Sequence, residues 1–244
     1  MLSLPVELYR PIAQHVERRR DLASFSLASR SVQSEVEPEL YRSFGLWGRF
    51  YKGVVWPQST LVPILKQLAN NPRQASHIHT LHVNSTSSIH RLVIPVLSAT
   101  INLKRLVLHI PLGIPLDPSN LPLFKLDWLL IMVQHTMLMS DEIDFLERQT
   151  ELKEMEWHHL RDVQYDLPFS IANLTTLLLH GRMSARTILL QQTVTNLSQE
   201  DGFSGYQSGD IFTSVRSLKT SKPLEVRQAK QFPNLQYLST TVRT

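Results

Sequence analysis

The sequence predicts an α/β protein with two parts, a small helical unit followed by a longer array of short strands with helical or loop returns. Three observations support this prediction. Apolar residues near the N-terminus recur at helical spacing, a six-residue apolar phrase recurs through the rest of the chain, and helix-like stretches separate several of the phrases. We place the helical unit at residues 1–45, a linker with a first packing helix at 46–75, and the strand array at 76–244.

The first helix is expected within residues 4–16. Pro5 suits the first helical position, and Glu7 lies in the first turn, where a carboxylate favours the helix dipole. The apolar face repeats every four residues and comprises Leu8, Ile12 and Val16. Pro11 interrupts this pattern, so the segment is expected either to kink there or to divide into two short pieces.

Two more helices are expected in the same unit. Asp21 is a candidate N-cap for the second, and the third runs from Ser31 to about Tyr41. A domain of about forty residues buries too little apolar surface to be stable alone without a metal, a disulfide or a partner. The unit is therefore expected to expose apolar surface that another protein, or the rest of this chain, completes.

The order and spacing of about a dozen residues then point to a family. They are Leu4-Pro5-x-Glu7-Leu8, Ile12, Val16, Asp21-Leu22, Leu27-Ala28-x-Arg30 and Glu37-Pro38-x-Leu40-Tyr41-Arg42. This pattern resembles an F-box, in particular the fungal-type F-box that runs into a Pro-x-Leu-Tyr-Arg tail. Ser29 and Ser31-Val32 depart from it, at positions where cysteine and tryptophan are common.

The resemblance implies a Skp-family adaptor as partner and, through that adaptor, a cullin and a RING protein. The residues it assigns to adaptor binding are Leu4, Pro5, Glu7, Leu8, Ile12, Val16, Leu22, Leu27 and Arg30. The alternative is that the helices are an ordinary cap on the domain that follows.

The strand array is predicted by a phrase of the form L-x-x-L-x-L. Its central residues are Leu81, Leu106, Leu129, Met155, Leu177, Leu218 and Leu238, at steps of 25, 23, 26, 22, 41 and 20 residues. The long step predicts either a degenerate repeat or a loop between residues 178 and 217. Helical returns are expected at 88–99 and 185–197, a packing helix at 61–70, and turns at the Asn-Leu pairs of Asn102, Asn173 and Asn234.

This periodicity resembles leucine-rich repeats, which implies an irregular solenoid of short parallel strands with helical or loop returns. The asparagine that should follow each strand is missing throughout. A generic α/β domain with coincidental leucines is the alternative.

Strand alternation predicts which side chains would face a target protein. In L-x-x-L-x-L the leucines point inward, so the outward candidates are Arg105, His109, Trp128, Leu130, Met132, Glu154, Glu156, His158, His180 and Tyr237. Three of these, Trp128, Leu130 and Met132, would form an apolar patch beside acidic residues, which is typical of a protein-binding hot spot. Loops of the same chain could instead cover and bury this patch.

Composition and motifs restrict the other functions. The chain has 244 residues, 19% of them charged, a formal net charge of +4 with scattered charges, and no cysteine. These features do not favour nucleic-acid binding and exclude disulfides and thiol catalysis. We expect no membrane span, no catalytic residues, no cofactor and no metal, because His77, His79 and His82 would not all lie on one side of a strand.

The sequence thus predicts a substrate-recognition adaptor of a Skp–cullin–F-box ubiquitin ligase that does no chemistry itself, in the cytoplasm, the nucleus or both. Its target protein is unknown. A ubiquitin-independent interaction scaffold is the alternative, and an enzyme on an unfamiliar α/β fold is the third hypothesis, which convergent carboxylates or histidines would favour. The chain stops just after a strand phrase, which leaves open a truncation.

Overall fold

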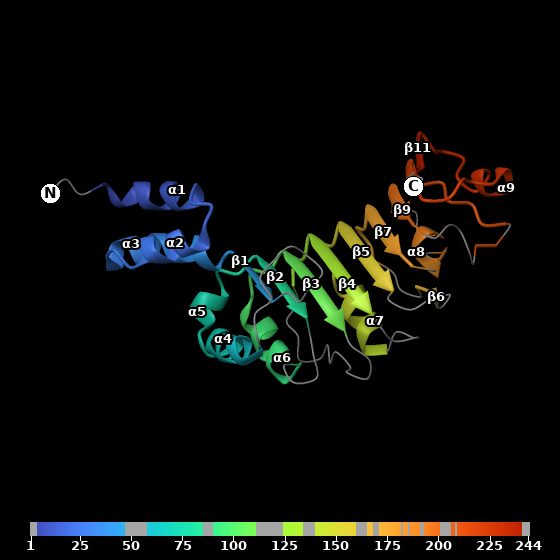
Figure 1. Cartoon of the computed structure of the whole chain (residues 1–244). Coiled ribbons are helices and arrows are strands. Elements are labelled where there is room, and N and C mark those ends of the chain that lie inside the picture. The colour runs from blue at the N-terminus through green and yellow to red at the C-terminus, as the bar shows by residue number, and fades with distance from the viewer. Residues whose placement is uncertain are drawn as a thin grey trace.

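The computed structural model describes residues 4–46, 58–84, 90–110, 124–133, 140–159, 165–167, 171–181, 183–184, 186–190, 193–200, 206–207 and 209–240. Within these residues the chain forms a nine-stranded, all-parallel sheet and nine α-helices, so the predicted α/β class is confirmed. Figure 1 shows the first three α-helices projecting from one end of a long row of strands, with most other helices beneath the row.

The N-terminal unit consists of a 3₁₀ turn, η1 (Val6–Leu8), and three helices, α1 (Tyr9–Gln14), α2 (Arg19–Ser26) and α3 (Arg30–Tyr41). The first predicted helix thus consists of a 3₁₀ turn that leads directly into α1 at Tyr9, so the segment does not divide at Pro11. Pro11 is the third residue of α1, where its missing N–H has no helical acceptor to lose. Asp21 lies in the first turn of α2 and Arg18 is the N-cap, so the predicted N-cap was wrong.

The large sheet has the strand order β1-β2-β3-β4-β5-β7-β9-β10-β11. Its strands are β1 (Ser43–Leu46), β2 (Thr80–Asn84), β3 (Arg105–Ile110), β4 (Trp128–Val133), β5 (Glu154–His159), β7 (Thr176–His180), β9 (Asn196–Gln199), β10 (Ser217–Thr220) and β11 (Tyr237–Thr240). A separate pair joins β6 (Tyr165–Asp166) to β8 (Met183–Ser184). The sheet therefore begins at Ser43, inside the range that the sequence analysis gave to the helical unit.

Strand register aligns all the predicted central residues in one column across the sheet. In order the column is Phe44, Leu81, Leu106, Leu129, Met155, Leu177, Leu197, Leu218 and Leu238. The long step of 41 residues is resolved by Leu197, which divides it into steps of 20 and 21 residues. The interval 178–217 therefore contains a further strand of the sheet.

After the helical unit, the described residues form the helices α4 (Gln58–Asn70), α5 (Pro72–Ala75), α6 (His90–Ala99), α7 (Ser140–Glu147), α8 (Arg186–Leu190) and α9 (Val226–Ala229). Helices α4, α6, α7 and α8 form one apolar core with most of the inward column. Leu65 of α4, Leu97 of α6 and Leu146 of α7 are buried in the same cluster as Leu106 and Leu177. The helix predicted at 185–197 is shorter than expected, because α8 ends at Leu190 and strand β9 begins at Asn196.

The three predicted Asn-Leu turns share one lateral hydrogen bond. Each asparagine precedes its strand by three residues and donates through Nδ2 to a carbonyl that precedes the neighbouring strand by four. The pairs are Asn102 to Ser76 at 2.8 Å, Asn173 to Thr150 at 2.7 Å and Asn234 to Thr213 at 2.8 Å. Because the same bond recurs at the same position, these units are equivalent in structure as well as in sequence.

The helical unit is tied to the start of the sheet. Glu37 of α3 accepts hydrogen bonds from Arg73 Nη2 at 2.8 Å and Gln74 Nε2 at 3.1 Å, both on α5. The carbonyl oxygen of Arg42 accepts from the backbone N–H groups of His79 and Thr80, at 2.9 and 3.0 Å. These contacts fix the C-terminal end of α3 against the first two strands.

Candidate functional site

The helical unit has a very small core of its own. Its buried cluster comprises four residues, Ala13, Leu22, Val32 and Val36. Several apolar side chains of the unit remain exposed, among them Leu4 at 53%, Leu8 at 44%, Ile12 at 39% and Leu27 at 83%. This is the condition expected of a surface completed by a partner.

The remaining predicted adaptor contacts differ in how exposed their side chains are. Pro5, Glu7 and Arg30 are exposed, and Val16 is half-buried against the small core. Leu22 is 5% exposed and belongs to that core, so it stabilises the unit and offers no free surface. Leu8 and Ile12 are one helical turn apart, so they lie on one face of the segment formed by η1 and α1.

The outer face of the sheet carries the predicted target contacts in three rows. Paired residues place Arg105 beside Trp128, Leu130 beside Glu156, and Met132 beside His158. Arg105 and Glu154 are exposed, and Tyr237 is 70% exposed. The guanidinium of Arg105 lies 5.3 Å from the centre of the Trp128 ring, a distance suited to a cation–π contact.

The apolar patch predicted on this face is only partly accessible. Leu130 points outward but is 3% exposed, so the expectation that it forms free surface was wrong. Trp128 and Met132 beside it are half-buried. His109 is also half-buried, and burial lowers its pKa. The central part of the outer face is therefore more enclosed than strand alternation alone indicates.

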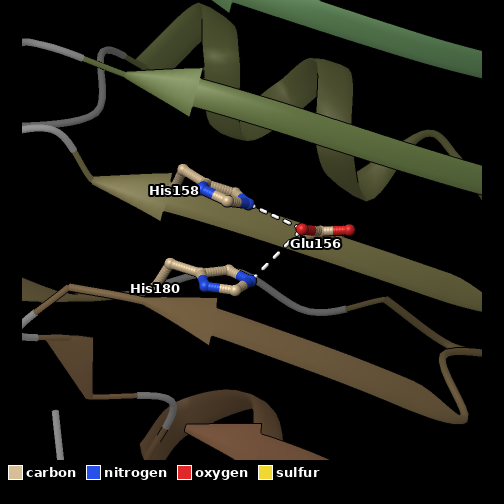
Figure 2. Close-up of side chains that lie close together, drawn as sticks. All are labelled: Glu156, His158 and His180. Carbon is tan, nitrogen blue, oxygen red and sulfur yellow. Dashed lines mark hydrogen bonds and ion pairs between the residues drawn. The ribbon is translucent and has the colours of Figure 1, made fainter. Parts of the chain in front are cut away.

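Three predicted residues converge further along the same face. Glu156 and His158 lie two residues apart on β5, and register places His180 of β7 directly opposite His158. The Oε1 atom of Glu156 lies 2.6 Å from His158 Nε2 and 3.2 Å from His180 Nε2, as Figure 2 shows. The two imidazole rings are stacked with centroids 3.8 Å apart.

A fourth residue, Glu200, extends this cluster. Its Oε2 atom lies 3.1 Å from Nδ1 of His180, on the other edge of the ring from Glu156. The hydrogen bond from His158 and the nearby imidazole of His180 lower the pKa of Glu156 to about 2. Burial alone would lower the pKa of His180, but the carboxylates of Glu156 and Glu200 outweigh it and the pKa is raised.

Three of these residues were predicted as target contacts from the sequence, whereas their convergence and the place of Glu200 were not predicted. The signal was available in the repeat step, because the 22 residues that separate Met155 from Leu177 also separate His158 from His180. The histidines considered from the sequence, His77, His79 and His82, do not belong to this cluster. Among the described residues, Glu156, His158 and His180 form the one group of histidine and carboxylate side chains close enough to hold a metal ion.

No protein-family model matches the sequence, and no curated protein matches it significantly. Of the helices that the structure describes, none has both the length and the apolar character needed to cross a bilayer. Functional inference for this chain therefore rests on its own residues: the exposed apolar face of the N-terminal helices and the rows on the outer face of the sheet.

Proposed function

We propose that this chain is the substrate receptor of a Skp–cullin–F-box ubiquitin ligase, with residues 1–45 as an F-box. The observation that supports the proposal most is the exposure of Leu4, Leu8, Ile12 and Leu27 on a unit whose own buried cluster has four residues. These four side chains occupy positions of the F-box pattern. A Skp-family adaptor that buried them would supply the apolar core that the unit lacks.

The sheet would be an irregular leucine-rich-repeat solenoid that presents a target. Support comes from the column of apolar residues that crosses all nine strands and from the asparagine hydrogen bond that recurs between neighbouring units. In such an array each unit buries its apolar side against the next, and the open face is left for binding. Exposed contacts for a target protein would be Arg105, Glu154 and Tyr237, with Trp128 as a half-buried anchor.

The receptor itself would do no chemistry. Tethering a target to the ligase raises the effective concentration of the target's lysines near the charged ubiquitin carrier. The same effect operates whenever two binding sites are linked. Cullin and RING subunits would be reached through the adaptor only. We place this activity in the cytoplasm or the nucleus.

The test is a pull-down of a purified Skp-family adaptor with Leu8→Asp/Ile12→Asp. Burying two carboxylates in an apolar interface is strongly unfavourable, so the variant is expected to lose adaptor binding. The control is Ile101→Asp, which places one carboxylate at an apolar residue that is 66% exposed on the sheet part of the chain, outside the helical unit. Circular dichroism should show that both variants remain folded. Undiminished binding by Leu8→Asp/Ile12→Asp would refute the F-box assignment.

A ubiquitin-independent scaffold is the second candidate, with the helices acting as a cap on the solenoid. It is favoured by the tie between α3 and α5, in which the side chain of Glu37 is 8% exposed and pairs with Arg73 at 2.8 Å. A cap needs such contacts, whereas an independent binding module does not. Affinity purification of the full chain separates the two, because a scaffold would recover partners without any Skp-family adaptor.

A further inference from the structure

We propose that Glu156, His158 and His180 bind a divalent transition-metal ion, with Zn²⁺ as the best match, and that Glu200 is a positioning residue for His180. This goes beyond the proposed receptor function and reverses the expectation, from sequence alone, that the chain holds no metal. Each of the three ligands offers one atom, and these atoms all lie within 4.8 Å of one another.

The spacing of the ligand atoms suits a tetrahedral ion. Zinc bonds to imidazole nitrogen and carboxylate oxygen are about 2.0–2.2 Å long, so tetrahedral ligand atoms are about 3.3 Å apart. The separation between Glu156 Oε1 and His180 Nε2 is 3.2 Å. His158 Nε2 lies closer, at 2.6 Å from the same oxygen, which is a hydrogen-bond distance. A small rotation of His158 would bring its nitrogen to the zinc distance.

One buried nitrogen atom of the cluster lacks a hydrogen bond. The Nε2 atom of His180 is buried and forms no well-aligned hydrogen bond with any described residue, although Glu156 is near. A buried polar atom without a hydrogen bond is costly, and such atoms recur at sites that bind an ion. Coordination by Nε2 to a metal ion would satisfy it.

Glu200 gives His180 the arrangement typical of a zinc ligand. Histidines that bind zinc through one ring nitrogen usually donate the other N–H to a carboxylate, which fixes the ring and its tautomer. Nδ1 of His180 lies 3.1 Å from Oε2 of Glu200, and Nε2 points toward Glu156. A proton held on Nδ1 leaves the lone pair of Nε2 free for the metal.

Three protein ligands would leave the fourth position of a tetrahedral ion for water. The ligands come from two neighbouring strands, and His180 is the one of the three that lines a concavity of about 280 Å³, together with Glu200 and Lys219 among others. Three protein ligands with a fourth position for water is the pattern of reactive zinc sites, whereas structural zinc sites are closed by four protein ligands. This convergence is also the feature that would favour the enzyme hypothesis.

The experiment measures Zn²⁺ binding to the full chain, purified without a histidine tag and stripped with a chelator. Isothermal titration with Zn²⁺ should give one equivalent, and Co²⁺ should give the visible absorption of a tetrahedral site. His158→Gln/His180→Gln and Glu156→Gln should each weaken binding by more than about 100-fold, which exceeds the loss typical of outer residues. Glu200→Gln should weaken it by about 10- to 100-fold.

The matched control is His109→Gln, which removes an imidazole from the same row of the outer face two strands away. It should bind Zn²⁺ as the wild type does. All the variants replace half-buried or exposed side chains with near-isosteric ones, so their folding can be checked by circular dichroism. Equal binding by wild type and His158→Gln/His180→Gln, or none by either, would overturn the proposal. The adaptor pull-down is independent of both results.

Discussion

Replacing Arg186 with methionine tests how the C-terminal units of the sheet are joined. The Nε atom of Arg186 on α8 lies 2.9 and 2.8 Å from the two carboxylate oxygens of Asp210. Asp210 also accepts the backbone N–H of Gln207 at 2.8 Å. Methionine has a similar length and fills the same space, so Arg186→Met removes the charge partner and leaves the fold around it intact.

The magnitude follows from burial. The side chain of Asp210 is 5% exposed and that of Arg186 is 32% exposed. Removing one partner of a buried ion pair costs about 3–5 kcal/mol, because the other charge is left buried without compensation. Here Gln207 still binds the carboxylate and water reaches the site through the exposed part of Arg186. We therefore expect the free energy of unfolding to fall by about 2–3 kcal/mol.

Urea unfolding with linear extrapolation measures this loss. Asp210→Asn serves as the second arm of a double-mutant cycle, because the amide keeps the shape of the side chain without its charge. If the pair acts as described, Arg186→Met should cost far less in the Asp210→Asn background than alone. Equal costs in both backgrounds, or a loss below about 0.5 kcal/mol in the wild-type background, would refute the reasoning.

The pH dependence of the same loss has a defined sign. The hydrogen bond and charge of Arg186 hold the pKa of Asp210 below its ordinary value of 3.8. A carboxyl group whose pKa is lowered by folding stabilises the protein above its unfolded pKa, and this stabilisation is lost as the pH falls through the folded pKa. The difference between wild type and Arg186→Met should be largest above about pH 5 and should shrink in stronger acid.

Three further predictions concern stability. Trp157→Ala should cost about 3–5 kcal/mol in urea unfolding, because Trp157 is fully buried and its removal leaves a cavity. Asn173→Ala should cost about 1 kcal/mol, seen as a lower Tm, because the 2.7 Å bond to the carbonyl of Thr150 is lost; no change would show that this bond contributes nothing. Arg73→Ala should cost about 1–2 kcal/mol and speed amide exchange in α3 more than in β4, because it leaves the Glu37 carboxylate buried with one donor.

Periodicity was sufficient to predict most of the sheet, because every unit places a similar residue in the same column. It failed where a residue other than a leucine-like one fills an inward position of a strand. Gln199 occupies the last inward position of β9 and is fully buried, accepting a hydrogen bond from the Tyr206 hydroxyl at 2.9 Å. The phrase Val194-x-x-Leu197-x-Gln199 was therefore not recognised within the long step, although β10 and β11 also end on a polar residue, Thr220 and Thr240.

The first strand was missed for a similar reason. Tyr41, Phe44 and Leu46 repeat the spacing of the phrase, but two aromatic residues stand where leucines were sought. Phe44 nevertheless pairs with Leu81 in the same column as the other central residues. A pattern defined by size and apolar character, and not by leucine, would have identified β1, whereas β9 needs a pattern that also accepts a polar residue at the last inward position.

For the candidate sites, the sequence predicted on which face of the sheet each side chain lies but not what fraction of that side chain is exposed. Strand alternation correctly placed Leu130 and Glu156 in one outward row. It carries no information on the curvature of a sheet or on the chain that crosses it, so the 3% exposure of Leu130 could not be foreseen. Convergence of His158 with His180 depends on register between separate units, which a single phrase does not encode.

The two ends of the strand row differ in how firmly they are held. At the first end, β1 follows directly from α3, and Glu37 clamps that helix to α5. At the other end all four residues of β11 are exposed, and Leu238 is 51% exposed although it belongs to the inward column. In a linear array where each unit contacts only its neighbours, opening starts at the less protected end. Backbone amides of β11 should therefore exchange with solvent faster than those of the central strands β4 and β5.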